Sequence, residues 1–268
     1  MTRDVSITWI EEVAREAGAL LRKRLDDRHV VEYKGEINLV TEADCLSEAL
    51  IVERIRREFP GHDILTEESP ETATGSDFRW IIDPLDGTTN YAHGYPVFCV
   101  SIALEVKGVI RQGAVYNPML NELFTAEKGA GAFLNGRSLT VSRTEALSRS
   151  LLATGFPYDI REDRNNNINY FRVMALSAQA VRRAGSAALD LAYIAAGRFD
   201  GFWELKLAPW DTAAGWLLVA EAGGCVTDLR GDPYHLRSRN MVASNGLIHA
   251  EMVRILAGTD PLDENAHG

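Results

Sequence analysis

The chain has 268 residues, of which 46% are hydrophobic and 25% are charged, so it is long enough to bury a substantial core. It contains no run of about 18 apolar residues that would predict a membrane-spanning helix, and its amphipathic N-terminus lacks the apolar core of a secretion signal. The net charge of −10 disfavours direct nucleic-acid binding, and the three scattered cysteines predict neither a disulfide framework nor a zinc cluster. We therefore expect a cytoplasmic protein.

The first half of the chain changes from helices to strands. Apolar residues recur at helical spacing over 7–21, where Thr8 and Glu11 predict a capping box, and over 46–59, before Pro60-Gly61. Short apolar runs separated by turn-forming residues then predict an antiparallel meander. These runs are 80–82, 97–106, 109–116, 122–126 and 132–134.

In the second half, strands and helices alternate. The predicted strands are 151–154, 199–205 and 225–229, and the predicted helices are 168–178, 186–196, 211–222 and 247–256. The polar tail from Thr259 is expected to fray. The pattern predicts an α+β half over 1–150 and an α/β half over 151–268, joined in one compact unit.

The most informative stretch is 83–90, Asp-Pro-Leu-Asp-Gly-Thr-Thr-Asn. It follows an apolar strand, so we expect Asp83 at the strand's C-terminal end, where Pro84 and Gly87 force a turn. Asp83 and Asp86 can then converge on one hard cation such as Mg²⁺, which prefers oxygen ligands, and 87–89 can offer backbone N–H groups to a phosphate. For an isolated Asp-x-x-Asp-Gly, the commoner alternative is a turn in which both aspartates only cap backbone groups.

Three further acidic positions have ordinary explanations when each is taken alone. Glu67 begins the segment Glu-Glu-Ser, which is typical of a solvated charge pair. Asp211 opens a predicted helix and Asp44 lies in the first turn of another, so either can be a cap or a first-turn residue. An acidic protein attracts a phosphate only through local positive charge, and cations bound by these carboxylates would provide it.

Taken together, these segments resemble the inositol monophosphatase family. The family pattern combines E-E-S, W-x-x-D-P-x-D-G-T-T-N and a W-D followed by a glycine-punctuated helix. The chain carries these at 67–69, 80–90 and 210–215, and its residues 183–192 resemble bacterial members. One departure is Asn38, where family members often carry Asp.

The resemblance implies a layered α/β/α/β/α sandwich, with two or three Mg²⁺ ions in the site. Asp83 would contact the first two ions. Glu67 and the carbonyl of Leu85 would complete the first site, and Asp86 and Asp211 the second. The 1–150 half would thus carry most metal ligands, and the 151–268 half would carry Asp211 and the polyol contacts.

The resemblance also implies catalytic and substrate-binding residues. Thr88, paired with Asp44, would orient the attacking water together with Glu67, and Asp44 would reach a weaker third ion through water. The implied substrate contacts are Asp86, Gly87, Thr88, Gly185, Ser186, Ala187, Glu204 and Asp211. Without the resemblance, Glu204 would be interpreted as a solvated strand residue and Ser186 as a helix N-cap.

The activity implied is hydrolysis of inositol monophosphate by metal-activated water, in a lithium-sensitive homodimer. The alternatives within the same superfamily are a fructose 1,6-bisphosphatase, a bifunctional enzyme that accepts both substrates, a nucleotide 3′-phosphatase and a histidinol phosphatase. A different class of function is a non-catalytic role through a protein partner, such as a transcription assembly. The expected ligand is a small phosphorylated polyol, and we expect neither membrane association nor direct nucleic-acid binding.

Overall fold

The computed structural model describes residues 5–25, 31–33 and 39–259. Asn38 and the tail beyond Thr259 lie outside this part of the chain. Within it, no helix combines the length and the apolar character needed to span a membrane.

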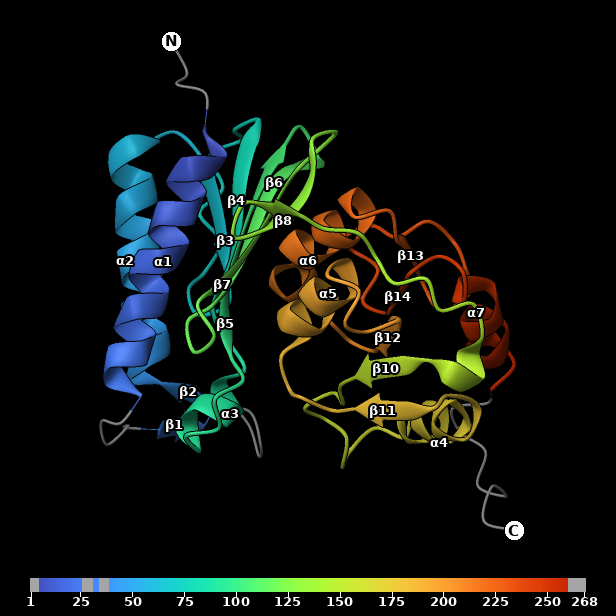
Figure 1. Ribbon diagram of the computed structural model, residues 1–268. Coiled ribbons are helices and arrows are strands. Elements are labelled where there is room, and N and C mark those ends of the chain that lie inside the picture. Colours follow the sequence, from blue (N-terminus) through green and yellow to red (C-terminus); the bar gives the residue numbers. More distant parts are fainter. Residues whose placement is uncertain (1–4, 26–30, 34–38, 260–268) are drawn as a thin grey trace.

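The first layer of the molecule is a pair of helices, α1 (Ile7–Arg24) and α2 (Glu42–Glu58). Both cover one face of a sheet that has seven strands in the described part of the chain (Figure 1). The strands are β3 (Asp63–Thr66), β4 (Phe78–Asp86), β5 (Cys99–Val106), β6 (Val109–Asn117), β7 (Glu122–Glu127), β8 (Gly131–Leu134) and β9 (Arg137–Ser138). A short hairpin of β1 (Val31–Tyr33) and β2 (Leu39–Thr41) precedes α2.

The predicted antiparallel meander is confirmed, because β4 to β9 pair in chain order, each antiparallel to the next. β3 lies parallel to β4 at the edge, so the sheet is mixed. A one-turn helix, α3 (Thr88–Ala92), follows β4.

The second sheet has the order β11-β10-β12-β14-β13. Its strands are β10 (Leu151–Thr154), β11 (Ala180–Arg182), β12 (Gly201–Glu204), β13 (Cys225–Thr227) and β14 (Met241–Ser244). β10 is parallel to β11 and β12, whereas β14 is antiparallel to its neighbours. The helices of this half are α4 (Ile168–Ser177), α5 (Ala187–Ala195), α6 (Pro209–Glu221) and α7 (His249–Ala257), and a 3₁₀ turn, η1 (Leu147–Arg149), precedes β10.

Alternation along the strands produces the layers. In β4, Ile82 points toward α1 and α2, whereas its neighbour Ile81 packs in a second core with residues of α5 and α6. In β12, Phe202 also faces α5, whereas Trp203 packs with residues of α4 and α7. The order is therefore helices, sheet, helices, sheet, helices (Figure 1), the sandwich that the family resemblance implies.

Close packing of the central helices requires small residues. A Cβ atom on Gly113 of β6 would lie 3.0 Å from the Cα atom of Ala214 in α6. The glycine thus allows α6 to approach the first sheet, and the N-terminal end of α6 lies close to β4 and β5. This contact joins the two halves through one shared core. The boundary near residue 150 stays a prediction.

The structure differs from the predicted elements at a helix start, at a strand end and in several short strands. Ser6, not Thr8, is the N-cap of α1, and its hydroxyl accepts a hydrogen bond from the backbone N–H of Trp9. β4 does not end at Asp83 but continues to Asp86, with a register irregularity between these two residues. The short strands β1, β2, β3, β9, β11 and β14 were not predicted, because four or fewer residues carry little periodic signal.

Candidate metal and substrate site

Carboxylates from three parts of the fold line a cavity of about 180 Å³. Asp83 and Asp86 come from β4, Asp211 from α6, and Glu67 from the segment that follows β3. The cavity also touches Leu85, the fifth residue implied as a metal ligand. The structure therefore brings together all five residues that the resemblance implies as ligands of two ions.

The irregular end of β4 directs two aspartates into this cavity. In a regular strand, residues three apart point to opposite faces, so the irregularity between Asp83 and Asp86 allows both to line one cavity. The Asp83 Oδ1 atom accepts a hydrogen bond of 3.0 Å from the N–H of Leu85. Gly87 follows with a φ of 100°, a left-handed conformation that suits glycine.

Asp86 joins the two halves of the chain. Its Oδ2 atom accepts hydrogen bonds from the Ser186 hydroxyl at 2.6 Å and from the Ala188 N–H at 2.8 Å, both at the start of α5. Burial raises the pKa of Asp86, and these two hydrogen bonds oppose the rise. The Asp86 carboxylate is therefore held in one orientation before any ligand binds.

Asp211 combines two roles that the sequence left as alternatives. It is the third residue of α6, and its Oδ2 atom accepts a hydrogen bond of 2.6 Å from the Ala208 N–H, so it caps the helix. It also lines the cavity with Asp83. Burial raises the pKa of Asp211 well above its usual value, and the charge of Glu67 adds to this effect.

Thr88 lies between Asp44 and β4. Its hydroxyl is 2.9 Å from Asp44 Oδ1 and 3.1 Å from the Leu85 carbonyl oxygen. The other oxygen of Asp44 accepts a hydrogen bond of 2.8 Å from the Thr41 N–H, as a capping box requires, so Asp44 is also the first-turn residue that the sequence offered as an alternative. Burial raises the pKa of Asp44, although its hydrogen bonds with Thr41 and Thr88 oppose the rise.

Glu48 was missed by the sequence analysis. This buried residue of α2 accepts a hydrogen bond of 3.0 Å from the Glu68 N–H and another from the Ser69 hydroxyl, so it fixes the segment that carries Glu67. A signal was present, because Asp44 and Glu48 are four residues apart and therefore share one helix face. That face also carries the buried Ile51 and was interpreted only as packing.

The electrostatics of this cavity of about 180 Å³ favour the binding of cations. Burial raises the pKa of Asp83 well above its usual value, and the charges of Glu67, Asp86 and Asp211 raise it further. In the described residues, no three His, Cys, Asp or Glu side chains are arranged as a ready-made metal cluster. The donors around the cavity are nevertheless oxygen atoms, the type that Mg²⁺ prefers, and their mutual repulsion would be relieved by a cation. The residues present fit that ion.

A second cavity, of about 330 Å³, adjoins the first. The residues common to both cavities are Asp86, Gly87, Thr88, Tyr158, Lys206 and Asp211. The second cavity adds all four remaining predicted substrate contacts, Gly185, Ser186, Ala187 and Glu204. Ser186 is also the N-cap of α5, so here too both interpretations hold.

Glu204 ends β12 and is not a solvated strand residue. It lines the larger cavity, and its burial raises its pKa to about 8, although the positive charge of Arg183 opposes the rise. A still larger cavity, of about 710 Å³, lies between α2 and residues 64–72, but none of the predicted site residues lines it. The chemistry therefore points to the two smaller cavities.

Comparison with solved structures defines the class of fold. The structure matches an inositol monophosphatase from Anabaena (Nostoc) with a TM-score of 0.87 and 46% sequence identity, covering 96% of each chain. It matches an inositol monophosphatase of Thermotoga maritima with a TM-score of 0.86 and 39% identity, covering 93% of this chain and 96% of that one. Two mixed sheets flanked by helices form the inositol monophosphatase fold.

The sequence comparisons identify the family. The family model described as the inositol monophosphatase family matches residues 3–258, and the chain belongs to this family. An inositol-1-monophosphatase of Synechocystis is 46% identical over 257 residues, covering 94% of this chain and 90% of that protein. A protein named Nus factor SuhB from Escherichia coli is 48% identical over 235 residues, covering 87% and 88% of the two chains.

Proposed function

We propose that the protein is a Mg²⁺-dependent phosphatase that hydrolyses inositol monophosphate to inositol and phosphate. The main support for this proposal is that two cavities adjoin. One is lined by the carboxylates of Asp83, Asp86 and Asp211, and the other by Glu204. The first suits cations and a phosphate, and the second suits a polyol. Relatives named inositol-1-monophosphatase support the same activity.

The metal ligands in this proposal are the residues around the smaller cavity. Asp83 would serve two ions, Glu67 and the Leu85 carbonyl would complete one site, and Asp86 and Asp211 the other. When bound, Mg²⁺ would acidify the attacking water and stabilise the leaving oxygen.

The chain's own residues would orient the water and the substrate. Thr88 lies 2.9 Å from Asp44, so its hydroxyl hydrogen is directed toward that carboxylate, and its oxygen is left to accept a hydrogen bond from the attacking water. Glu67 would act with this pair, and Asp44 would reach a third, weaker ion through water. This arrangement requires no Ser, Cys or His nucleophile.

The substrate contacts in the proposal follow the larger cavity. The small residues Gly185, Ser186 and Ala187 allow a polyol ring to approach the backbone, and Glu204 would accept hydrogen bonds from ring hydroxyls. The same metal cavity would serve fructose 1,6-bisphosphate, a nucleotide 3′-phosphate or histidinol phosphate, so these remain the alternatives.

A substrate panel tests the proposal. Phosphate release is measured with Mg²⁺ on inositol 1-phosphate, fructose 1,6-bisphosphate, a nucleoside 3′,5′-bisphosphate, histidinol phosphate and p-nitrophenyl phosphate. The highest kcat/KM is expected for inositol 1-phosphate. A clear preference for another member of the panel would replace inositol phosphate as the substrate, whereas no release from any of them would reject the phosphatase itself.

The variant Glu204→Ala tests the polyol contact. Loss of hydrogen bonds to a charged group is expected to lower kcat/KM on inositol 1-phosphate by about ten- to hundredfold. The value for p-nitrophenyl phosphate, which has no ring hydroxyls, should change little because the metal cavity is intact. Equal losses on both substrates would instead assign Glu204 to the metal cavity or the fold.

A second candidate function is a role through a protein partner. Relatives 45–48% identical to the chain are named Nus factor SuhB, which motivates a role in a transcription assembly. Pull-down from a bacterial extract, with and without Mg²⁺, tests it; recovery of transcription proteins is expected only if this role exists. We also propose that the protein is cytoplasmic, forms a homodimer and is inhibited by Li⁺. Light scattering would test the homodimer, and activity assays with Li⁺ would test the inhibition.

A further inference from the structure

Two residues that line both cavities have no part in the proposed chemistry. Of the six described residues common to the cavities, Asp86, Gly87, Thr88 and Asp211 belong to the predicted site, whereas Tyr158 and Lys206 do not. Lys206 follows β12 two residues after Glu204, and Tyr158 lies in the segment 155–167 between β10 and α4. Both residues lie where the smaller cavity, of about 180 Å³, meets the larger one, of about 330 Å³.

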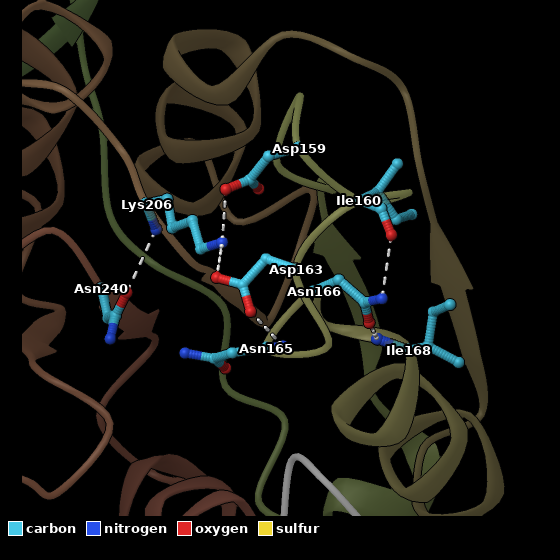
Figure 2. Close-up of polar contacts among 8 residues, drawn as sticks. All are labelled: Asp159, Ile160, Asp163, Asn165, Asn166, Ile168, Lys206 and Asn240. Atoms are coloured by element: carbon cyan, nitrogen blue, oxygen red, sulfur yellow. Dashed lines mark hydrogen bonds and ion pairs between the residues drawn. The ribbon is translucent and has the colours of Figure 1, made fainter.

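Lys206 has a backbone conformation that few lysines adopt. Its φ is 60°, in the left-handed region that disfavours residues with a Cβ atom. Its N–H donates a hydrogen bond of 3.1 Å to Asn240 Oδ1, which helps to fix this conformation (Figure 2). A left-handed conformation at a residue that lines a cavity is typical of a functional position, which directs attention to the Lys206 side chain.

The Lys206 ammonium group bridges two carboxylates of the segment 155–167. Its Nζ atom lies 2.7 Å from Asp159 Oδ2 and 2.6 Å from Asp163 Oδ2, and Figure 2 shows it between them. The Lys206 side chain is only 18% exposed. An isolated ion pair at a surface contributes little, but one ammonium group held by two carboxylates at once is a stronger constraint than a single pair.

The remainder of the segment is held by its own hydrogen bonds. Asn166 donates to the Ile160 carbonyl at 3.0 Å and accepts from the Ile168 N–H at 3.2 Å (Figure 2). At the end of the segment, the buried Asn167 accepts a hydrogen bond of 2.7 Å from the Trp203 indole. The C-terminal end of the segment is thus anchored to β12, and Lys206 contacts its middle, next to Tyr158.

Tyr158 is the residue whose position this arrangement controls. It is 55% exposed although it lines both cavities, so it stands at their rim. Asp159, the next residue, is one of the two that Lys206 holds. Movement of Asp159 would therefore displace Tyr158 from the rim and open the larger cavity on the side of Gly155.

We propose that Lys206 is a positioning residue that sets the affinity for the polyol: by holding Asp159 and Asp163, it keeps Tyr158 and the segment 155–167 against the larger cavity. This inference rests on the proposed function for its substrate. It adds a residue outside the metal ligands and outside the predicted polyol contacts.

The test compares Lys206→Met with a matched control. Lys107 also has a positive φ, of 52°, and its Nζ atom lies 3.6 Å from Asp77 Oδ2, but it lines neither cavity. Lys206→Met is expected to raise KM for inositol 1-phosphate about tenfold, the scale of ordering one or two side chains on binding, with kcat changed less than about twofold. Lys107→Met should leave both constants unchanged, and Lys206→Arg should restore most of the affinity.

Two further measurements separate positioning from a general structural role. KM for p-nitrophenyl phosphate should change little in Lys206→Met, because that substrate lacks the polyol. The pair Asp159→Asn with Asp163→Asn should raise KM for inositol 1-phosphate as Lys206→Met does, and combining all three changes should add nothing. Equal KM increases on both substrates, or additive effects, would overturn the proposal.

Limited trypsin digestion gives a readout that does not need activity. Arg161 and Arg164 lie in the segment 155–167, so cleavage after them should be several-fold faster in Lys206→Met than in Lys107→Met. An unchanged cleavage rate would overturn the role of Lys206 in holding the segment. If the parent protein released no phosphate from any substrate, the proposed function would fail, and digestion would still decide whether Lys206 fixes the segment.

Discussion

Asp86 is the residue at which the metal cavity, the polyol cavity and the two halves of the chain meet. Its side chain accepts hydrogen bonds from Ser186 and Ala188 and lines both cavities. Asp86→Asn retains the shape and removes a charge from the proposed second metal site. We expect kcat/KM on inositol 1-phosphate to fall by about 10²–10³, as is common when preorganised charge stabilisation is lost.

The control for Asp86→Asn is the melting temperature of the metal-free variant. Burial already disfavours the charged form of Asp86, so replacing the carboxylate by the asparagine amide should not lower the melting temperature. Activity within a few-fold of the parent would remove Asp86 from the ligand set.

Glu204 predicts a pH dependence of stability in metal-free protein. Its pKa is raised to about 8 in the fold, so between its usual value and about pH 8 the native state retains a proton that the unfolded chain releases. Stability must therefore fall as pH rises through this range. Glu204→Gln should lose less free energy of unfolding between pH 5.5 and 8 than the parent, by about 1 kcal/mol or more.

Urea unfolding in chelator at both pH values measures this difference. The matched control is Glu53→Gln, at an exposed position of α2, which should keep the slope of the parent. An identical slope in Glu204→Gln would mean that Glu204 titrates in the fold as it does in the unfolded chain.

Among single residues, the sequence predicted the members of the candidate site when they belonged to a motif. Asp83, Asp86 and Asp211 were predicted and do line one cavity. Glu48 and Lys206 were not, because a single charged residue on a helix or after a strand is usually solvated, and only the folded chain brings their partners to them.

Among the elements, the contact of α6 with β6 is the tightest constraint on the junction of the two halves. A Cβ atom on Gly113 would lie 3.0 Å from Ala214 Cα and 3.2 Å from its Cβ. Gly113→Ala is therefore expected to destabilise the protein by about 1–3 kcal/mol through overpacking. The control is Gly61→Ala, where the added Cβ meets nothing within 4 Å.

Both variants are measured by urea unfolding. Gly61→Ala should be neutral or slightly stabilising, because alanine has less conformational freedom than glycine in the unfolded chain. Equal stability of the two variants would contradict the close approach of α6 to the first sheet.

Long amphipathic helices and the meander were predictable because their periodic patterns are local. The end of β4 was not, because the irregularity that carries the chain from Asp83 to Asp86 depends on pairing with β5. β14 was missed for a similar reason: it has four residues, and its strand partners β12 and β13 are distant in sequence or separated by a loop. The hydrophobic pattern therefore specified layers better than strand ends.

For the whole molecule, the central claim is that the carboxylates around the smaller cavity, at the junction of the two halves, need Mg²⁺ for catalysis, whereas the fold does not need it. The four cores that join the layers are apolar, and none of these carboxylates belongs to them. Metal removal should therefore leave the layered structure in place while the acidic cavity loses its attraction for phosphate.

Phosphate release from inositol 1-phosphate, followed while Mg²⁺ is removed by a chelator and then restored, tests this claim most directly. Circular dichroism of the same samples reports the fold. We predict that release stops in chelator, that the spectrum is unchanged at room temperature, and that excess Mg²⁺ restores the full rate. Release that continues undiminished in chelator, or an unfolded metal-free protein, would contradict the account.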